Sequence, residues 1–550
     1  MRLLTGEHSD EEAALETIAA AAEAGITVFD TARAYGANEA LLTRALRACG
    51  AHERARIVTK GGMSNAAGAW VPDGRAKAIR ADCEASLVAL DGLPIDVYLL
   101  HAPDPRTPWR TSVRALARLV DDGHVRRIGL ANVNRRQLDE ALELTPVAAV
   151  QVALSPFDNR ALRGGIVDRC AEEGIAVMAH SPLGGPSRAG RVDRVEELVR
   201  VADASNATPA EVSLAWLLDL SPVVVPIPGA RRPETARSAA RSAALDLDAH
   251  DIAALTRAFG RPLVERPRVE AGRAGEVVIV MGIPGAGKSR VAGEYVERGY
   301  VRLNRDERGG TLRALVVPLE EALALPEPRV VLDNTYLTRD SRSYVLDAAV
   351  RHGALVRCVW LDTPLAQAQV NLTARLLDRF GQLPGPADLR ALAKREQGVL
   401  APTSQMRAVR ELEPPSVDEG FVAVERLAFT RATHRGREGV FVAASAVRES
   451  GWTAAGSAPH LVFDWLPDGS ADALTAEVER VVAHVTGAVE AAVCPHPGGP
   501  STCWCRPPLP GLILAFARAH DVDSSRSTLV GTSSAHRTLA TTLGARFVAA

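Results

Sequence analysis

The chain has 550 residues, which is too long for one hydrophobic core and predicts three or more domains. Apolar residues make up 47% and charged residues 24%, and 64 Lys and Arg against 66 Asp and Glu argue against a polycation made to coat nucleic acid or membrane. No apolar segment is long enough to span a bilayer, and the N-terminus lacks the pattern of a signal peptide. We therefore expect a cytoplasmic protein with no membrane partner.

Residues 1–262 alternate short apolar runs with amphipathic stretches rich in Ala, Leu and Arg, a pattern that predicts repeated strands and helices with a parallel sheet. The size and the run count predict an α/β fold, a (β/α)8 TIM barrel. We expect its first strand to be missing or truncated, because the chain begins a few residues before its first helix. The seven strand-like runs are 26–30, 55–60, 96–101, 126–132, 148–154, 175–181 and 223–229.

Polar residues stand where the early runs end, which is the edge where TIM barrels collect their chemistry. Asp30, Lys60 and His101 each end a run, and Tyr35 lies in the loop after the first. Lys60 is one of only four lysines in an Arg-rich chain. The segments around these residues, with two later ones, resemble the aldo-keto reductases: FDTARAYG (29–36), VTKGG (58–62), LLHAPD (99–104), HSPLGG (180–185) and PIPGARRPE (226–234).

Reduction of a carbonyl by hydride needs a proton donor, and a Tyr hydroxyl can serve at neutral pH if a nearby cation lowers its pKa. We expect Tyr35 to be that donor, Lys60 held by Asp30 to be the cation, and His101 to orient a small carbonyl substrate. The resemblance implies NADPH as the cofactor. Its expected contacts are Asn132 and Gln151 at the nicotinamide amide, Ser181 and Leu183 along the pyrophosphate, and Gly229, Arg231 and Arg232 toward the adenosine 2′-phosphate.

Two departures from the family pattern lead us to expect weaker or altered cofactor binding. Leu154 stands where the family stacks an aromatic ring on the nicotinamide, and Ala131 stands where a Ser precedes the Asn.

A stretch rich in Arg, Pro and Gly at 263–275 predicts a linker, and a strand, glycine loop and helix follow it. The loop contains the whole G-x-x-x-x-G-K-S pattern of a P-loop. Its glycines turn backbone N–H groups toward phosphates, the Lys reaches the β- and γ-phosphates, and the Ser binds Mg²⁺. We predict an ATP-dependent, P-loop α/β kinase domain at 276–430, with Gly282, Gly285, Gly287, Lys288 and Ser289 in these roles.

Four further segments resemble, in order and spacing, the kinase half of polynucleotide kinase-phosphatases: 303–315, 330–353, 357–375 and 411–427. The resemblance implies Asp306 as the general base for an acceptor hydroxyl, with a helix N-cap as its alternative role. It places Asp333 near the acceptor with Arg342 close by, and Arg375 or Arg379 as the lid arginine. The acceptor is then a 5′-hydroxyl nucleic-acid end or a sugar-like alcohol.

Residues 437–550 resemble haloacid-dehalogenase-type phosphatases that act on histidinol phosphate and heptose bisphosphate, chiefly through CPHPGGPSTCWCRPPLPG (494–511). Three of the seven cysteines lie there. Three thiolates and an imidazole form a closed shell suited to structural Zn²⁺. The predicted ligands are Cys494, His496, Cys503 and Cys505.

This third domain is predicted to be a Rossmann-like fold without catalysis, because aspartyl-phosphate chemistry needs a nucleophilic carboxylate and metal ligands. Asp464 and Asp468 follow the wrong strand to substitute for the missing groups. The matching positions hold Ala443 and Ser445 for the two catalytic Asp, Pro507 for the Lys, and Thr532 after Gly531 and His536 for the metal-binding acids.

The sequence therefore predicts a reductase fused to a kinase and an inactive phosphatase domain. One hypothesis couples them, because reduction of a carbonyl makes the alcohol that a kinase phosphorylates. Two alternatives stay open: only the kinase is active and the barrel is a nucleotide-binding scaffold, or both enzymes act on small molecules with no nucleic-acid role. No pattern in the sequence predicts an oligomeric state.

Overall fold

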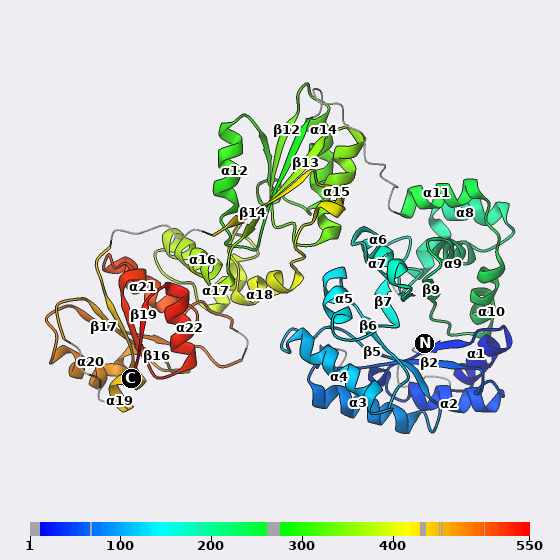
Figure 1. Ribbon diagram of the computed structural model, residues 1–550, viewed down its shortest axis with the longest axis horizontal. Coiled ribbons are helices and arrows are strands. Elements are labelled where there is room, and N and C mark those ends of the chain that lie inside the picture. The colour runs from blue at the N-terminus through cyan, green and yellow to red at the C-terminus, as the bar shows by residue number, and fades with distance from the viewer. Residues whose placement is uncertain are drawn as a thin grey trace. The chain divides into compact units, whose positions relative to one another are not determined.

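In a computed structural model of the chain, the structure describes residues 11–66, 69–185, 188–260, 275–429, 436–449, 452, 455–499 and 501–550. The chain divides into two compact units, Met1–Val264 and Glu265–Ala550, which are treated separately below (Figure 1). The predicted linker at 263–275 falls outside the described residues except for Gly275. None of the helices in these described ranges is long and apolar enough to cross a membrane.

The first unit is a nearly closed barrel, in which each of the seven predicted runs forms a strand. Within the described residues the strands are parallel and neighbours in chain order, as the TIM-barrel prediction requires. They are β1 (Val28–Asp30), β2 (Arg56–Gly61), β5 (Ile95–Leu100), β6 (Ile128–Ala131), β7 (Ala149–Ala153), β8 (Ala176–His180) and β9 (Val224–Ile227). The segment that would hold an eighth strand precedes residue 11 and lies outside the described ranges.

Helices follow the strands and cover the outside of the sheet (Figure 1). They are α1 (Glu11–Glu23), α2 (Asn38–Ala48), α3 (Ala76–Ala89), α4 (Trp109–Asp121), α5 (Arg135–Leu142), α6 (Arg160–Arg163), α7 (Ile166–Glu173), α8 (Glu196–Ala204), α9 (Pro209–Asp219), α10 (Pro233–Arg241) and α11 (Ala249–Phe259). An antiparallel hairpin that the sequence analysis did not predict, β3 (Met63–Ala66) with β4 (Ala69–Pro72), follows β2.

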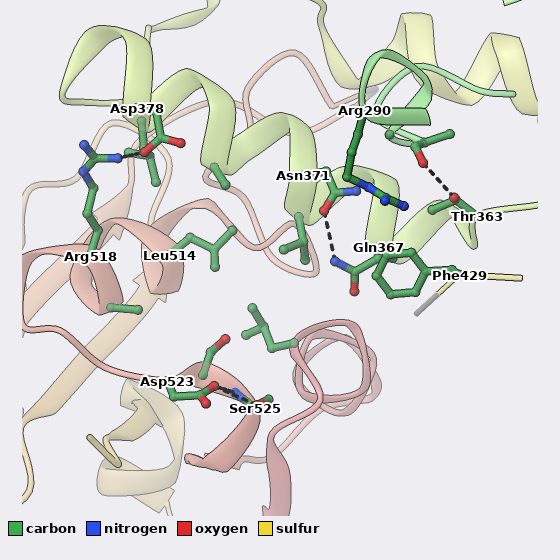
Figure 2. Close-up of a pocket in the computed structure, with 18 of the residues that line it drawn as sticks. Arg290, Thr363, Gln367, Asn371, Asp378, Phe429, Leu514, Arg518, Asp523 and Ser525 are labelled. Atoms are coloured by element: carbon green, nitrogen blue, oxygen red, sulfur yellow. Dashed lines mark hydrogen bonds and ion pairs between the residues drawn. The ribbon is translucent and has the colours of Figure 1, made fainter. Parts of the chain in front are cut away.

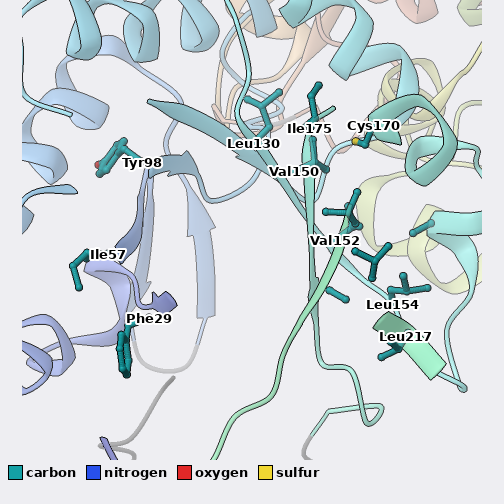
Figure 3. Close-up of a cluster of buried hydrophobic side chains, with 14 of the residues drawn as sticks. Phe29, Ile57, Tyr98, Leu130, Val150, Val152, Leu154, Cys170, Ile175 and Leu217 are labelled. Atoms are coloured by element: carbon teal, nitrogen blue, oxygen red, sulfur yellow. The ribbon is translucent and has the colours of Figure 1, made fainter. Parts of the chain in front are cut away.

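Side chains along the barrel strands alternate between the helices and the interior, with a period of two residues. Figure 3 shows part of the helix-facing set, which includes Ile57, Tyr98 and Val150. A smaller interior cluster contains Val58, Leu99, Ala131, Ala149 and Met178. Two residues beyond the interior positions of β2, β5, β7 and β8 come, in turn, Lys60, His101, Gln151 and His180. The apolar alternation therefore delivers polar groups to one end of the barrel.

The second unit contains two parallel sheets, each five strands among the described residues. The first has the order β11-β12-β10-β13-β14, with β10 (Glu276–Met281) in the centre. Its other strands are β11 (Val301–Leu303), β12 (Arg329–Asp333), β13 (Leu355–Asp362) and β14 (Ala423–Ala428). Its helices are α12 (Lys288–Glu297), α13 (Arg305–Arg308), α14 (Val316–Leu323), α15 (Arg339–Arg351), α16 (Leu365–Phe380), α17 (Pro386–Leu392) and α18 (Pro402–Glu411).

The last sheet has the order β17-β16-β15-β18-β19 and is formed entirely from residues after 439. Its strands are β15 (Val440–Ala443), β16 (His460–Trp465), β17 (Val489–Cys494), β18 (Thr528–Gly531) and β19 (Arg546–Ala549). Its helices are α19 (Ala444–Glu449), α20 (Thr475–Val482), α21 (Gly511–Ala519) and α22 (Ser534–Leu543). Ala443 and Ser445, which the sequence analysis placed at the two catalytic Asp positions, therefore lie at the end of β15 and at the start of α19.

The two sheets of this unit share packing through α16, which contacts both α21 and α22. Trp504, from the cysteine-rich loop, is 1% exposed and packs with Leu372, Leu376 and Leu389 of the helices α16 and α17. Its indole Nε1 donates to the carbonyl oxygen of Leu400 at 2.9 Å. A hydrophobic contact with one directed hydrogen bond thus joins this loop to the part of the chain that forms the first of the two sheets.

A buried ion pair on α15 shows that one sequence-based assignment is wrong. Arg342, expected near the phosphoryl acceptor, is 0% exposed and pairs with Glu419 at 2.6–2.7 Å. Its other N–H groups donate to the carbonyl oxygens of Tyr336 and Glu413 at 3.0 Å. Arg342 is therefore a structural residue that fastens the chain entering β14 to α15.

We expect Arg342→Met to lower the free energy of unfolding of the second unit by about 3–5 kcal/mol, because it leaves the Glu419 carboxylate buried without its partner. Arg351→Met, on the same helix, removes the exposed pair with Glu320 and should change it by less than about 1 kcal/mol. Chemical unfolding of the two variants checks the difference. Equal stability of both would show that the buried pair contributes little.

Candidate functional site

Lys60 and Asp30 form an ion pair at the carboxyl ends of β2 and β1. The Nζ of Lys60 donates to both carboxylate oxygens of Asp30 at 2.7 Å and to the carbonyl oxygen of Thr31 at 2.8 Å. The amide Nε2 of Gln151 donates to the same carboxylate at 2.8 Å. Burial lowers the pKa of Lys60 against the attraction of Asp30; burial would raise the pKa of Asp30, but the Lys60 charge leaves it lowered. The predicted pairing of these residues is present in the structure.

Tyr35 lies beside this pair, on the 3-10 turn Arg33–Tyr35 after β1. The Lys60 ammonium is 5.4 Å from the centre of its ring. The ring also makes an edge contact with His101, with centroids 5.8 Å apart, and with Trp70 at 6.1 Å. Trp70 comes from the unpredicted β3–β4 hairpin and is 42% exposed, so the sequence pattern held no signal for its place here.

His101 is the neutral member of the group. It is 8% exposed, and burial, reinforced by the Lys60 charge, lowers its pKa to about 4. Its buried Nδ1 has no hydrogen-bond partner among the described residues. A neutral imidazole whose ring contacts Tyr35 suits the role of orienting a carbonyl oxygen.

His180, which the sequence analysis did not single out, completes the rim. Its Nε2 lies 3.2 Å from Oδ1 of Asn132, and its Nδ1 lies 3.2 Å from Oγ of Ser181. Asn132 and Ser181 both have positive φ, 57° and 52°, a conformation that costs a non-glycine residue about 1–3 kcal/mol and is common at functional sites. The signal for His180 was its interior position two residues after Met178.

The other residues expected to contact a cofactor are distributed around the same end of the barrel. Leu183 is half-buried against the main core, while Gly229, Arg231 and Arg232 are exposed between β9 and α10. Leu154 is different: it is 0% exposed and belongs to the helix-facing cluster, so its expected place against the nicotinamide is wrong. The strand alternation turns it away from the interior.

The P-loop lies between the end of β10 and the start of α12 at Lys288. Gly282, Gly285 and Gly287 have φ of 154°, 86° and 95°. A Cβ on Gly285 would lie 2.4 Å from the carbonyl oxygen of Ala368, so no other residue fits there. Lys288 donates to the carbonyl oxygens of Gly282 and Ile283 at 3.1 Å, and loss of solvation lowers its pKa to about 8.

The predicted catalytic groups meet at this loop in one cavity of about 520 Å³. Asp333 ends β12, is almost fully buried, and accepts from Arg302 and from Asn304. Asp306 is not the helix N-cap considered as its alternative role, because Asn304 caps α13 with its side-chain oxygen. The cavity is lined by Lys288, Ser289, Asn304, Asp306, Asp333, Arg375, Lys394, Arg395 and Arg407, among others.

The structure separates the two candidates for the lid arginine. Arg375 lines this cavity and contributes to the field around Lys288. Arg379, one turn later on α16, pairs with Glu396 and donates to the carbonyl oxygen of Gln397. Of these two arginines, Arg375 lines the cavity beside the P-loop, and Arg379 holds the loop after α17.

The four predicted metal ligands come together at the end of β17. Their sulfur and nitrogen atoms all lie within 4.8 Å of one another, with Cys494 Sγ 3.7 Å from Cys503 Sγ and His496 Nδ1 3.2 Å from Cys505 Sγ. Zn–S bonds of about 2.3 Å in a tetrahedron place sulfur atoms about 3.8 Å apart, so the spacing and the donor set fit Zn²⁺.

The side chains at the positions that the sequence analysis compared with phosphatase catalytic groups also lie together. Ser445 Oγ is 2.6 Å from Thr532 Oγ1, and His536 Nδ1 accepts from the backbone N–H of Thr532 at 3.3 Å. Asp464 is occupied by an ion pair with Arg448, 3.0 Å away. The group thus consists of two hydroxyl groups and an imidazole, and the nearby Asp464 carboxylate is engaged by Arg448.

Comparison with known proteins shows the family to which the barrel unit belongs. A model of the aldo/keto reductase family matches residues 1–259. The chain is 33% identical over 261 residues to probable aldo-keto reductase 1 of Glycine max, and the alignment covers 41% of this chain and 74% of that protein. It is 28% identical over 294 residues to aldo-keto reductase str7 of Strobilurus tenacellus, covering 48% and 84%. The chain belongs to the aldo/keto reductase family through its first unit.

Two further matches complete the comparison. A model described as an AAA domain matches residues 309–396, which begin after the P-loop and end in the loop that Arg379 holds. Among solved structures, the aldo/keto reductase from Klebsiella pneumoniae in complex with NADP and acetate is 27% identical, with a TM-score of 0.41, covering 48% of this chain and 90% of that chain.

Because burial lowers the pKa of His101 to about 4, we expect its ring to stay neutral from pH 8 down to about pH 5. A histidine with a lowered pKa gains its proton only below that value, whereas the unfolded chain titrates near pH 6.5. NMR of the histidine ring carbons, assigned with a His101→Asn variant, measures the midpoint. A midpoint at or above pH 6 would contradict the burial described here.

Proposed function

We propose that the barrel is an NADPH-dependent reductase that converts a small carbonyl compound to an alcohol. The observation that carries this proposal is the group of Tyr35, Lys60, Asp30 and His101 at the carboxyl end of the barrel of an aldo/keto reductase family member. Bound NADPH would supply the hydride to the carbonyl carbon. Arg231 and Arg232 are exposed where a 2′-phosphate would need cations, which favours NADPH over NADH.

The chain's own residues supply the proton and the orientation. The Tyr35 hydroxyl gives its proton to the carbonyl oxygen, and the Lys60 ammonium stabilises the tyrosinate that remains. Asp30 keeps Lys60 charged despite burial, and Gln151 fixes Asp30. His101 donates from a neutral ring to the same oxygen. Trp70 and Tyr35 shape an aromatic mouth, which favours substrates with an apolar side.

We expect Tyr35→Phe to lower kcat for reduction of 4-nitrobenzaldehyde at least about a hundredfold, because it removes the proton donor. NADPH binding, followed by fluorescence titration, should stay within about twofold, since the ring is retained. Tyr344→Phe, far along the chain on α15, is the matched control and should behave as the parent. If the parent binds NADPH but reduces no member of an aldehyde and ketone panel, the barrel is a nucleotide-binding scaffold instead.

The second proposal is that residues 276–430 form an ATP- and Mg²⁺-dependent kinase that phosphorylates a hydroxyl group. It is carried by the cavity that joins the P-loop Lys288 and Ser289 to Asp306, Asp333 and Arg375. Mg²⁺ fits beside the Ser289 hydroxyl and the ATP phosphates. Asp306 would take the proton of the acceptor hydroxyl, and Arg375 would neutralise the transferring phosphoryl.

The cations on the acceptor side favour a 5′-hydroxyl nucleic-acid end as the acceptor. Besides Lys288 and Arg375, the cavity is lined by four basic side chains: Arg305, Lys394, Arg395 and Arg407. The acidic side chains in the lining are Asp306, Asp333, Glu396 and Glu411. Phosphodiester backbones are bound through clusters of basic side chains. The alternative acceptor is a small alcohol made by the barrel, which would couple the two activities.

The third proposal concerns residues 437–550. We propose a phosphatase-type domain that binds Zn²⁺ through Cys494, His496, Cys503 and Cys505 and has no phosphatase activity of its own. The donor spacing supports the metal, and the hydroxyl groups at Ser445 and Thr532 support the loss of chemistry. The proposed boundaries are thus 1–262 for the barrel, 263–275 for the linker, 276–430 for the kinase and 437–550 for this domain.

The kinase proposal is tested with γ-labelled ATP, Mg²⁺ and 5′-hydroxyl DNA and RNA oligonucleotides. We expect label transfer to be abolished by Lys288→Ala, which removes the phosphate contact, and lowered at least about a hundredfold by Asp306→Asn. Lys77→Ala, an exposed lysine on α3, is the matched control. ATP binding without transfer to either oligonucleotide would contradict the nucleic-acid acceptor and direct the search to small alcohols.

A further inference from the structure

A second cavity of about 650 Å³ opens on the other side of the P-loop, and the proposed chemistry uses none of it. We propose that it holds the nucleoside of the triphosphate and that the C-terminal sheet supplies one of its walls. The catalytically silent domain then has a function: it closes the donor site of the kinase. This inference rests on the proposed nucleotide binding at Lys288.

The position of the cavity follows from the direction of phosphoryl transfer. The attacking and leaving oxygens lie roughly in line through the transferred phosphorus, so the donor's nucleoside must extend away from the acceptor. Gly287 lines both cavities, and Lys288, Asp306 and Asp333 line only the first. The groups proposed to act on the acceptor line the first cavity, so the nucleoside of the donor is expected in the second cavity.

The kinase side of the cavity is a rigid polar rim with one aromatic ring. Asn371 Nδ2 donates to the carbonyl oxygen of Gly285 at 2.8 Å, and Gln367 Nε2 donates to Asn371 Oδ1 at 3.1 Å. Thr363 Oγ1 donates to the carbonyl oxygen of Ala286 at 3.1 Å. These bonds tie α16 to the P-loop. The half-buried ring of Phe429, just after β14, offers a surface on which a base can stack.

The opposite wall comes from the C-terminal sheet. Figure 2 shows Gln367 and Asn371 of α16 on one side and the turn of Asp523 and Ser525 on the other. Leu514 and Ala517 of α21, the turn before β18, and Leu543 of α22 line this side. Asp523 shapes the turn by accepting from the backbone N–H and the hydroxyl of Ser525 at 2.9 and 2.7 Å. This wall therefore combines the apolar side chains of Leu514, Ala517 and Leu543 with a polar turn that its own hydrogen bonds hold in place, and small-molecule sites use both kinds of group.

Two contacts hold the wall against the kinase part. Arg518 of α21 forms an ion pair with Asp378 of α16. The buried indole of Trp504 packs under the same helix and donates to Leu400. The zinc-type loop carries Trp504 between two of its ligands, Cys503 and Cys505. The metal loop is therefore part of the attachment of the wall.

The experiment compares Mg-ATP with Mg-tripolyphosphate, which has the phosphates but no nucleoside, by titration calorimetry on the full chain. Ser524→Trp and Leu514→Trp fill the cavity from two different elements of the C-terminal sheet. We expect each to weaken ATP binding about tenfold, the loss of one stacked base, and to leave tripolyphosphate binding within about twofold. Ser534→Trp, exposed at the start of α22, is the matched control and should change neither.

The outcomes separate the inference from the function on which it rests. If the parent chain binds neither ligand, the proposed nucleotide site is wrong. If the parent binds both ligands equally tightly, or if the filled variants bind ATP as the parent does, the C-terminal wall is wrong while the P-loop site stands. If the filled variants bind ATP and tripolyphosphate more weakly by the same factor, the proposed C-terminal wall is also wrong, because the effect would then lie in the phosphate site.

Discussion

The ammonium of Lys60 touches both oxygens of Asp30 and one backbone carbonyl, and its side chain is 0% exposed. Removing a charge from water costs several kcal/mol unless a partner is close and well oriented. Asp30, Gln151 and Thr31 are arranged around that requirement, and Tyr35 and His101 take their places around the resulting charge. The geometry of the barrel site therefore depends on keeping one cation dry and paired.

The second unit uses a lysine differently. Among the described residues, no carboxylate forms an ion pair with Lys288. Its Nζ donates to two carbonyl oxygens of its own loop, and Asp333 acts on it through space. Its pKa of about 8 indicates a charge held poorly without an anion nearby. A bound phosphate would give the Lys288 ammonium the anionic partner that it lacks, whereas the Lys60 ammonium already has a carboxylate and a carbonyl oxygen as partners. This difference matches an electrostatic role for Lys60 and a ligand-binding role for Lys288.

Much of this arrangement could be predicted from the sequence, because parallel strands with a period of two bring their carboxyl ends to one edge. Asp30, Lys60 and His101 were found in this way, and the P-loop was found because only glycine fits where Gly285 approaches Ala368. Trp70 was missed because a short hairpin in a loop carries no long periodic signal. His180 was missed although the alternation after Met178 indicated it.

Arg342 shows what the sequence could not predict. An arginine that contacts an active site and an arginine that pairs with the distant, buried Glu419 look the same along the chain. The pairing depends on a contact across 77 residues, which only the folded sheet establishes. Leu154 was misplaced for a related reason: a shift of one residue on a strand moves a side chain to the other face. Both errors concern the direction in which a side chain points, whereas each of the seven predicted barrel runs does form a strand.

The last strand of the kinase-type sheet ends at Ala428, and the C-terminal sheet begins at Val440. A connection this short gives the two parts an effective concentration in the millimolar range or above. The contacts of Trp504 and Arg518 therefore need little intrinsic affinity to keep the sheets together. The C-terminal sheet can then stay beside its neighbour with only these few contacts, since covalent attachment supplies what a separate protein would need an extensive interface to achieve.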